Sequence, residues 1–182
     1  MTHLTMEQLE PGLDQIRRAP RDRGVLRMIV RRPVTEQREV LEEATLDLCE
    51  ALVGDNWKNR GSKKTPDGSA HPDMQITIMG ARTIELLAGE RDRWALAGDQ
   101  LFIDLDLSVE NLPPGTRLAI GEAVVQITEP PHTGCRKFEA RFGLDALKFV
   151  NSPMGKQLRL RGLHARIIQP GAIRVEDAVK KV

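Results

Sequence analysis

Cys135 lies in a short stretch that combines several chemically useful residue types. The stretch reads Glu129-Pro130-Pro131-His132-Thr133-Gly134-Cys135-Arg136-Lys137-Phe138. It follows a predicted strand, and its prolines and glycine are typical of an exposed turn. The two basic residues after the cysteine favour the thiolate over the thiol by charge attraction. We therefore expect an accessible thiolate that could act as a nucleophile or as a soft-metal ligand.

Three readings of this cysteine remain open from residue types alone. A catalytic thiol needs a base, and His132 is only three residues away, but no rule of local geometry places it within hydrogen-bond reach. A metal or sulfur ligand needs only exposure, and Arg136, Lys137 and Arg141 could also hold a phosphate. An inert cysteine is the third reading.

Other polar stretches have both a structural and a functional interpretation. Asp55 and Asn56 follow a glycine and either form a turn through their own backbone or line a pocket. Asn111 precedes an apolar residue and two prolines, which favours a turn. The alternating charges of residues 161–166 are typical of a solvated sheet face. The sequence contains no phosphate-binding loop and no metalloprotease helix.

Composition excludes several classes of function. The 182 residues carry a net charge of +1, which gives no global field for nucleic acid or an anionic membrane. Aromatic residues make up only 3%, which argues against base-stacking RNA modules. The two cysteines form no zinc-type pair, and residues 1–16 contain no apolar signal-peptide core. We expect a reduced cytoplasmic protein that neither enters a membrane nor binds nucleic acid.

Apolar patterning and turn residues predict a mixture of short strands and helices. Thr35 as an N-cap, followed by Leu41, Ala44, Leu48 and Leu52, predicts a helix over 35–53, with Cys49 as a buried structural thiol. The remaining helices are expected at residues 82–87, 138–142 and 144–150. Strands are expected at residues 24–31, 75–79, 100–106, 117–120, 123–128, 157–161, 164–169 and 172–175.

The many short strands after residue 70 favour a mainly β, α+β fold with a barrel-like core and peripheral helices. Residues 1–22 are expected to form a lead-in, with a capping box at Thr5-Met6-Glu7-Gln8. Residues 23–182 are expected to form one domain. The long polar loop 54–72 is of a kind that is often functional or mobile.

Taken together, these stretches resemble the MOSC domain, which is named for the C-terminal domain of molybdenum cofactor sulfurases. The most specific element is the hairpin at 117–128, followed by the proline-rich turn and a single cysteine. Glu176 departs from the resemblance, because the family pattern usually has Gly before Asp there. The other matching segments are Gly54-Asp55, Gln75-Ile76-Thr77, Gly98-Asp99-Gln100-Leu101, residues 110–118 and residues 171–179.

The resemblance implies a barrel with peripheral helices, a molybdenum-pterin cofactor and a functional cysteine at position 135. In amidoxime-reducing members the equivalent cysteine ligates molybdenum, and in others it is linked to sulfur transfer. Cys135 is thus both the catalytic and the metal-binding candidate. Candidate cofactor-binding residues are Asp55, Asn56, Arg82, Asn111, His132, Thr133, Arg136, Lys137 and Arg141.

The resemblance leaves three functions open. The chain could be an oxidoreductase that reduces small N-oxygenated substrates, a sulfur carrier or cofactor-delivery module using a Cys135 persulfide, or a binding domain without chemistry. The roughly 50 residues before the match are too few for the extra domains of larger family members. The electron or sulfur donor is therefore expected to be a separate protein, and the N-terminal residues either cover the barrel or mediate a homodimer.

Overall fold

A local irregularity places the longest strand, β1 (Arg23–Arg31), between two apolar layers. In the computed structural model, which describes residues 3–182, a β-bulge falls between Leu26 and Met28. The extra residue shifts the side-chain alternation, so Leu26 and Ile29 both face the inner core. Met28 and Val30 face a second core under the helices. The bulge therefore lets one strand serve both layers.

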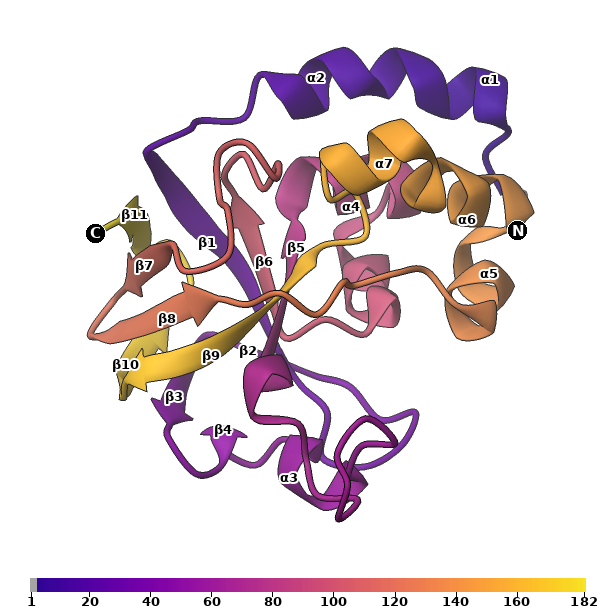
Figure 1. Ribbon diagram of the computed structural model, residues 1–182. Helices are drawn as coiled ribbons and strands as arrows, with labels where there is room; N and C mark the ends of the chain where they lie inside the picture. Colours follow the sequence, from indigo (N-terminus) through magenta and orange to yellow (C-terminus); the bar gives the residue numbers. More distant parts are fainter. Residues whose placement is uncertain (1–2) are drawn as a thin grey trace.

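Seven strands close into a barrel. Figure 1 shows how these strands are arranged beneath the helices. The order around the barrel is β1-β11-β7-β8-β9-β5-β6, and β6 pairs with β1 again. All neighbours are antiparallel except β5 and β6, which are parallel and need a crossover connection. Besides β1, the barrel strands are β5 (Ile76–Gly80), β6 (Leu101–Asp104), β7 (Arg117–Ile120), β8 (Ala123–Ile127), β9 (Leu163–Gln169) and β11 (Ala178–Lys181).

Helices pack outside the barrel and cover the second core. The crossover consists of α4 (Ala81–Ala88) and η3 (Arg91–Ala97). The expected capping box is confirmed, because the Thr5 backbone N–H donates to Gln8 Oε1 at 2.9 Å. Figure 1 shows the N-terminal helices crossing above α4, α6 and α7. The remaining helices are α1 (Met6–Leu9), η1 (Glu10–Gly12), α2 (Leu13–Arg17), α3 (Trp57–Arg60), η2 (Pro72–Met74), α5 (Arg136–Phe142), α6 (Leu144–Asn151) and α7 (Pro153–Gln157).

The helix predicted over residues 35–53 is wrong. This segment forms β2 (Glu39–Leu41), β3 (Glu43–Asp47) and β4 (Ala51–Leu52). β2 pairs with β1, and β3 pairs with β10 (Gly171–Arg174), more than 120 residues further along the chain. These long-range backbone hydrogen bonds outweigh a helical spacing that sequence patterns alone cannot distinguish.

The expectation that Cys49 is buried is also wrong. Cys49 is exposed in the turn between β3 and β4. Asp47 Oδ1 accepts the backbone N–H groups of Cys49 and Glu50 at 2.7 and 2.9 Å, which stabilises the turn. Ala51 then adopts a positive φ of 64° to enter β4.

The strand predicted at 157–161 is absent from the described residues, and a closing strand was missed. Ser152 is the N-cap of α7 and accepts the Gly155 N–H at 2.9 Å, with Pro153 at the first helical position. A helix therefore starts here, and residues 157–161 complete the helix and the turns that follow it. β11 follows the strand that the sequence predicted to be the last.

The other expected strands and helices are confirmed within a few residues, including the β7–β8 hairpin about Gly121. The loop 54–72 is irregular apart from α3. Among residues 3–182, no helix has the length and apolar character that crossing a membrane requires.

Barrel closure by β11 predicts a large effect of truncating Val179. This side chain is fully buried, and its residue pairs with both β1 and β7. Val179→Ala should lower the free energy of unfolding by about 2 kcal/mol through lost apolar burial and a cavity. Val182→Ala is the matched control, since Val182 is 71% exposed, and should change stability by less than about 0.5 kcal/mol. If the two variants lowered the free energy of unfolding equally in urea denaturation, the role of β11 in closing the barrel would be contradicted.

Candidate functional site

The residues between β8 and α5 form a strap, defined here as residues 128–135, which carries Cys135. Near its end, the Gly134 N–H donates to Asn151 Oδ1 at 2.9 Å, and Asn151 Nδ2 donates to the Gly134 carbonyl at 3.1 Å. A Cβ at Gly134 would lie 2.7 Å from Leu147 Cδ1, so a larger residue would require the Leu147 side chain to shift. Cys135 is exposed, as expected, and is the N-cap of α5 with extended backbone and no side-chain capping bond.

A buried ion pair lies at the end of the barrel that carries α3, which we call the entrance of the barrel. Arg32 Nε and Nη2 each donate to a carboxylate oxygen of Asp55 at 2.8 Å, and Arg32 Nη1 donates to the Gly98 carbonyl at 2.9 Å. Both side chains are almost fully buried. Asp55 also accepts the Trp57 N–H, which begins α3. The bidentate geometry makes Arg32 a fixed part of the scaffold.

A second buried pair joins the barrel to the helix of Cys135. Arg161 Nη1 donates to Asp99 Oδ2 at 2.6 Å, and Arg161 Nη2 donates to the Ala97 carbonyl at 3.0 Å. The Arg161 guanidinium lies over the ring of Phe138 on α5, 5.0 Å from its centroid. Burial raises the pKa of Asp99, and Arg161 opposes that shift. The pair thus positions the first turn of α5.

Two neutral histidines hold the strap against this network. His132 Nδ1 lies 3.4 Å from Asp99 Oδ1, and its ring centroid is 4.6 Å from that of His164. His164 Nδ1 donates to the Pro130 carbonyl at 2.9 Å, because a carbonyl oxygen can only accept. Burial lowers the pKa of His132 well below 6.5 and that of His164 to about 4. Both rings are therefore neutral near pH 7.

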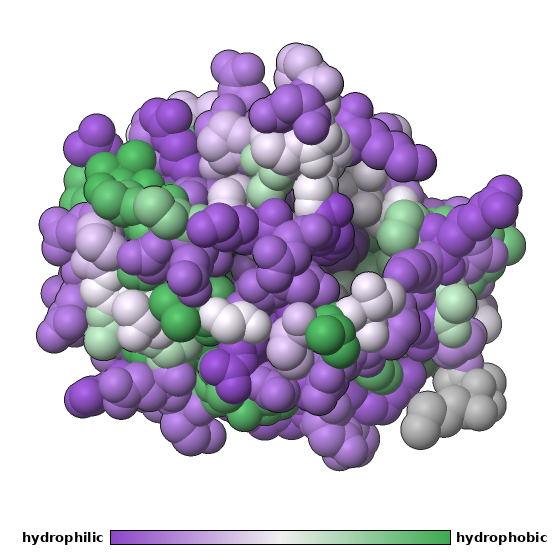
Figure 2. Space-filling model, turned by 90° about the horizontal axis from the view of Figure 1, so that it is seen from below, coloured by the Kyte–Doolittle hydropathy of each residue, from purple (hydrophilic) through white to green (hydrophobic). Residues whose placement is uncertain are grey.

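Further arginines make the entrance cationic and leave donors unpaired. Burial, together with the charges of Arg141 and Arg32, lowers the pKa of Arg38. Burial and Arg32 likewise lower the pKa of Arg60. Figure 2, seen from the end that carries α3, shows a hollow edged by hydrophilic residues. Buried atoms here without a protein partner are Arg38 Nε, Asn56 Oδ1, Asp99 Oδ1, His132 Nδ1 and Arg161 Nε.

Unpaired buried donors and neighbouring like charges are both unfavourable without a ligand or water. A bound anion that also accepts hydrogen bonds would satisfy both conditions. We name the set Arg32, Arg38, Arg60 and Arg161 the arginine cluster. It is a candidate site for an anionic group, next to the helix that Cys135 begins.

Several predicted site residues gather at this cluster. Asp55 pairs with Arg32, Asn56 follows Asp55 in the chain, and the charges of Arg161, Arg32 and Arg60 act on His132. The charge of Arg141 acts on Arg38. Lys137 and Arg141 donate to the two carboxylate oxygens of Glu36, which ties α5 to the loop after β1. Thr133 and Arg136 are exposed on either side of Cys135.

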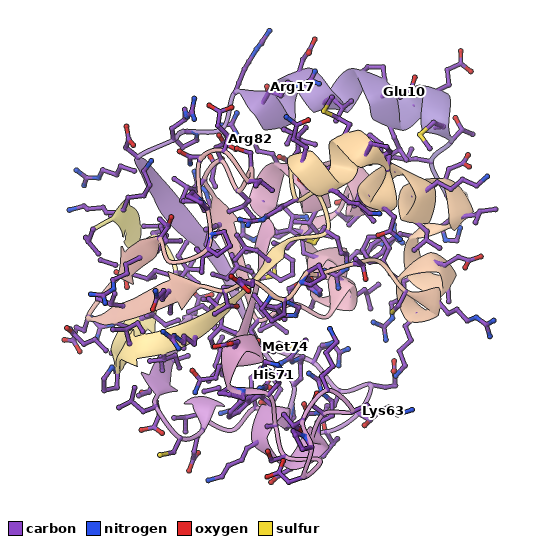
Figure 3. The ribbon with its side chains drawn as sticks, in the orientation of Figure 1. Glu10, Arg17, Lys63, His71, Met74 and Arg82 are labelled. Atoms are coloured by element: carbon purple, nitrogen blue, oxygen red, sulfur yellow. The ribbon has the colours of Figure 1, made fainter. Side chains whose placement is uncertain are left out.

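Two predicted residues lie elsewhere. Arg82 on α4 pairs with Asp104 at 2.7 Å and lies beside the N-terminal helix, at the opposite end of the barrel from His71 (Figure 3). Asn111 Nδ2 donates to the carbonyls of Arg21 and Asp106 at 2.9 and 2.8 Å, so it holds chain segments together. Neither is brought to the arginine cluster.

The arginine cluster itself was missed from sequence. The segment 161–166 was interpreted as a solvated face, but Arg161 and His164 are buried, which corrects that interpretation. The signal that could have found the cluster is Gly98-Asp99. Asp99 is fully buried, and a buried carboxylate needs a cationic partner. For Arg38 and Arg60, no local pattern marks the role.

The buried histidines predict a pH dependence of stability. The unfolded chain binds protons at His132 and His164 below about pH 6.5, whereas the folded protein does not until lower pH. The free energy of unfolding should therefore fall as pH drops from about 6.5 to about 4, by roughly 3 kcal/mol for His164. His164→Asn keeps a donor for Pro130 and should flatten this decline. Parallel curves for the two proteins, measured by urea denaturation against pH, would contradict it.

The comparisons with known proteins agree with this architecture. The YuaD protein from Bacillus subtilis superposes with a TM-score of 0.64 at 14% identity, over 87% of this chain and 95% of that chain. YiiM from Escherichia coli gives a TM-score of 0.56 at 19% identity, over 87% of this chain and 69% of that chain. YiiM from Geobacillus stearothermophilus gives 0.51 at 15% identity, over 87% and 73%.

At these identities the structural matches establish the fold alone. No curated protein matches the chain. The MOSC domain family, however, matches residues 66–180, more than half of the chain, from just before β5 to the closing strand β11. On this match and the closed barrel, the protein belongs to the MOSC domain family.

Proposed function

We propose that this protein binds a molybdenum-pterin cofactor through Cys135 and supports the reduction of a small N-oxygenated substrate. The observation that carries the proposal is the arginine cluster, in which the buried donors Arg38 Nε and Arg161 Nε lack protein partners, beside the helix that an exposed cysteine begins. An anionic cofactor with a soft metal would need both features.

Cys135 supplies the soft ligand. Thiolate sulfur is a preferred ligand for soft metal sites. The residues 3–182 contain no group of three or more His, Cys, Asp or Glu side chains that could hold a metal ion. A metal bound here would therefore bring most of its ligands with it, and a metal coordinated by the sulfur atoms of its own pterin meets that requirement.

The arginine cluster supplies the anion site. Charge-assisted hydrogen bonds from arginine to phosphate are strong and geometrically specific, especially where burial lowers the local dielectric. Arg38 Nε and Arg161 Nε are the unpaired donors, and Asn56 Oδ1 is an unpaired acceptor that suits a ring N–H. These residues would hold the phosphate and the pterin edge.

The bound cofactor would supply two-electron redox chemistry, and the chain would bind and orient it. In the reaction a hydroxylamine-type N–O bond breaks, two electrons and two protons are taken up, and the oxygen leaves as water. The two cysteines of the chain are too few for the four thiolates of an iron–sulfur cluster. The electrons would therefore come from a separate donor protein.

Metal analysis tests the proposal directly. The protein purified from a host that makes the cofactor should contain molybdenum and pterin. Cys135→Ser should reduce the molybdenum content by at least about tenfold, since even residues that only support a ligand change metal affinity by 10–100-fold. Cys49→Ser is the matched control, because Cys49 is the other exposed cysteine, and should leave the content unchanged.

Absence of molybdenum from the wild-type protein, or equal content in both serine variants, would overturn the proposal. A second variant, Arg60→Met, should lower pterin content while the Cys135 ligand remains. Folding of each variant is checked by its urea denaturation midpoint.

The exposed thiol also supports a second function, a sulfur carrier. Cys135 has no side-chain capping bond and is accessible from solvent. Its thiolate could attack the terminal sulfur of a cysteine desulfurase persulfide, which forms the Cys135 persulfide and releases the desulfurase thiolate.

Mass spectrometry after incubation with a cysteine desulfurase and cysteine distinguishes this function. Cys135 should gain one sulfur atom that a reducing thiol removes, whereas Cys49 should gain little. Labelling of both cysteines to the same extent would indicate non-specific exchange. If Cys135→Ala leaves both cofactor content and ligand binding unchanged, the protein is a binding domain in which Cys135 performs no chemistry.

A further inference from the structure

A cavity of about 380 Å³ lies between the strap, α7 and the start of β9. The strap residues 128–131 border this cavity and also a wider groove of about 770 Å³. The cavity's size falls in the range of small-molecule sites, about 300–1,000 Å³. Its apolar wall consists of Val109, Val150, Leu163, Pro130 and Pro131. The walls therefore suit the apolar body of a small molecule.

Two cations border the same cavity without an ion-pair partner. Lys156 on α7 is exposed, and no carboxylate of residues 3–182 lies within ion-pair distance of it or of Arg159. Arg159 Nη1 donates to the Leu112 carbonyl at 2.6 Å and lies 3.5 Å from the Leu107 carbonyl, so two neutral backbone oxygens fix the guanidinium. Burial alone lowers the pKa of Arg159, and no carboxylate opposes it.

The charge balance of the wall is positive. Glu129 is the only acidic residue among the described residues that line the cavity, and it is exposed on the strap. His132, which also lines it, is neutral near pH 7 because burial lowers its pKa. Two cations thus face one carboxylate, and a partly buried cation without a counterion gains most from an anionic ligand.

We propose that this cavity binds a small carboxylate with an apolar body. The carboxylate lies between Lys156 and Arg159, and the body packs against Val150, Leu163 and the strap prolines. The ligand would border the strap that carries Cys135, but its binding requires neither the thiol nor a cofactor. The site borders the arginine cluster at His132 but does not rest on the proposed function.

Benzoate is a suitable probe, with benzamide as its uncharged counterpart. Titrated into isotope-labelled protein, benzoate should shift the amide signals of Val150, Gly155 and Leu163 in nuclear magnetic resonance spectra. Benzamide should bind at least about tenfold more weakly, because it lacks the charge-assisted hydrogen bonds. Lys156→Met should weaken benzoate binding by about the same factor.

Lys148→Met is the matched control, since Lys148 is an exposed lysine on α6 outside the cavity wall. It should leave benzoate binding unchanged. Equal binding of benzoate and benzamide, shifts confined to other parts of the protein, or equal effects of the two lysine variants would each overturn the proposal. Repeating the titration with Cys135→Ser separates this result from the proposed function, because that variant should bind benzoate normally.

Discussion

The ion pair between Asp99 and Arg161 connects the parts of the molecule on which the site depends. Asp99 precedes β6 and Arg161 precedes β9, so the pair joins two barrel strands that flank β5. Arg161 also lies over Phe138 on α5, and Asp99 faces His132 on the strap. Burying such a pair has a desolvation cost that the attraction only partly offsets. Its position therefore indicates a role in orienting the strap and helix around Cys135.

The surrounding charges support the same interpretation. Arg32 is fully matched by Asp55, but Arg38 and Arg60 have burial and like charges that lower their pKa. A sequence optimised only for stability would not keep unpaired cations at the entrance of a barrel, because each costs free energy when no anion is present. Conflicts between local stability and structure are expected where a protein binds a ligand.

Local signals predicted a large part of the fold. The β7–β8 hairpin, α4 and the two helices after Cys135 follow from alternation, helical spacing and glycine positions. The prediction of a helix over residues 35–53 was wrong for a specific reason. The apolar residues fit a helix, but β3 pairs with β10, which is far away in the sequence. β11 was not predicted, because its four residues form a strand only through their pairing with β1 and β7.

The sequence by itself determined the proline-rich strap that carries Cys135 and the basic residues beside it, because turn chemistry and neighbouring charges are local properties. It also carried the resemblance to the MOSC domain. Only the tertiary structure decided that Arg32, Arg38, Arg60 and Arg161 meet, and that Arg82 and Asn111 do not join them. Barrel closure brings residues more than 100 positions apart to one entrance, and whether an arginine there is solvated or buried depends on those long-range pairings.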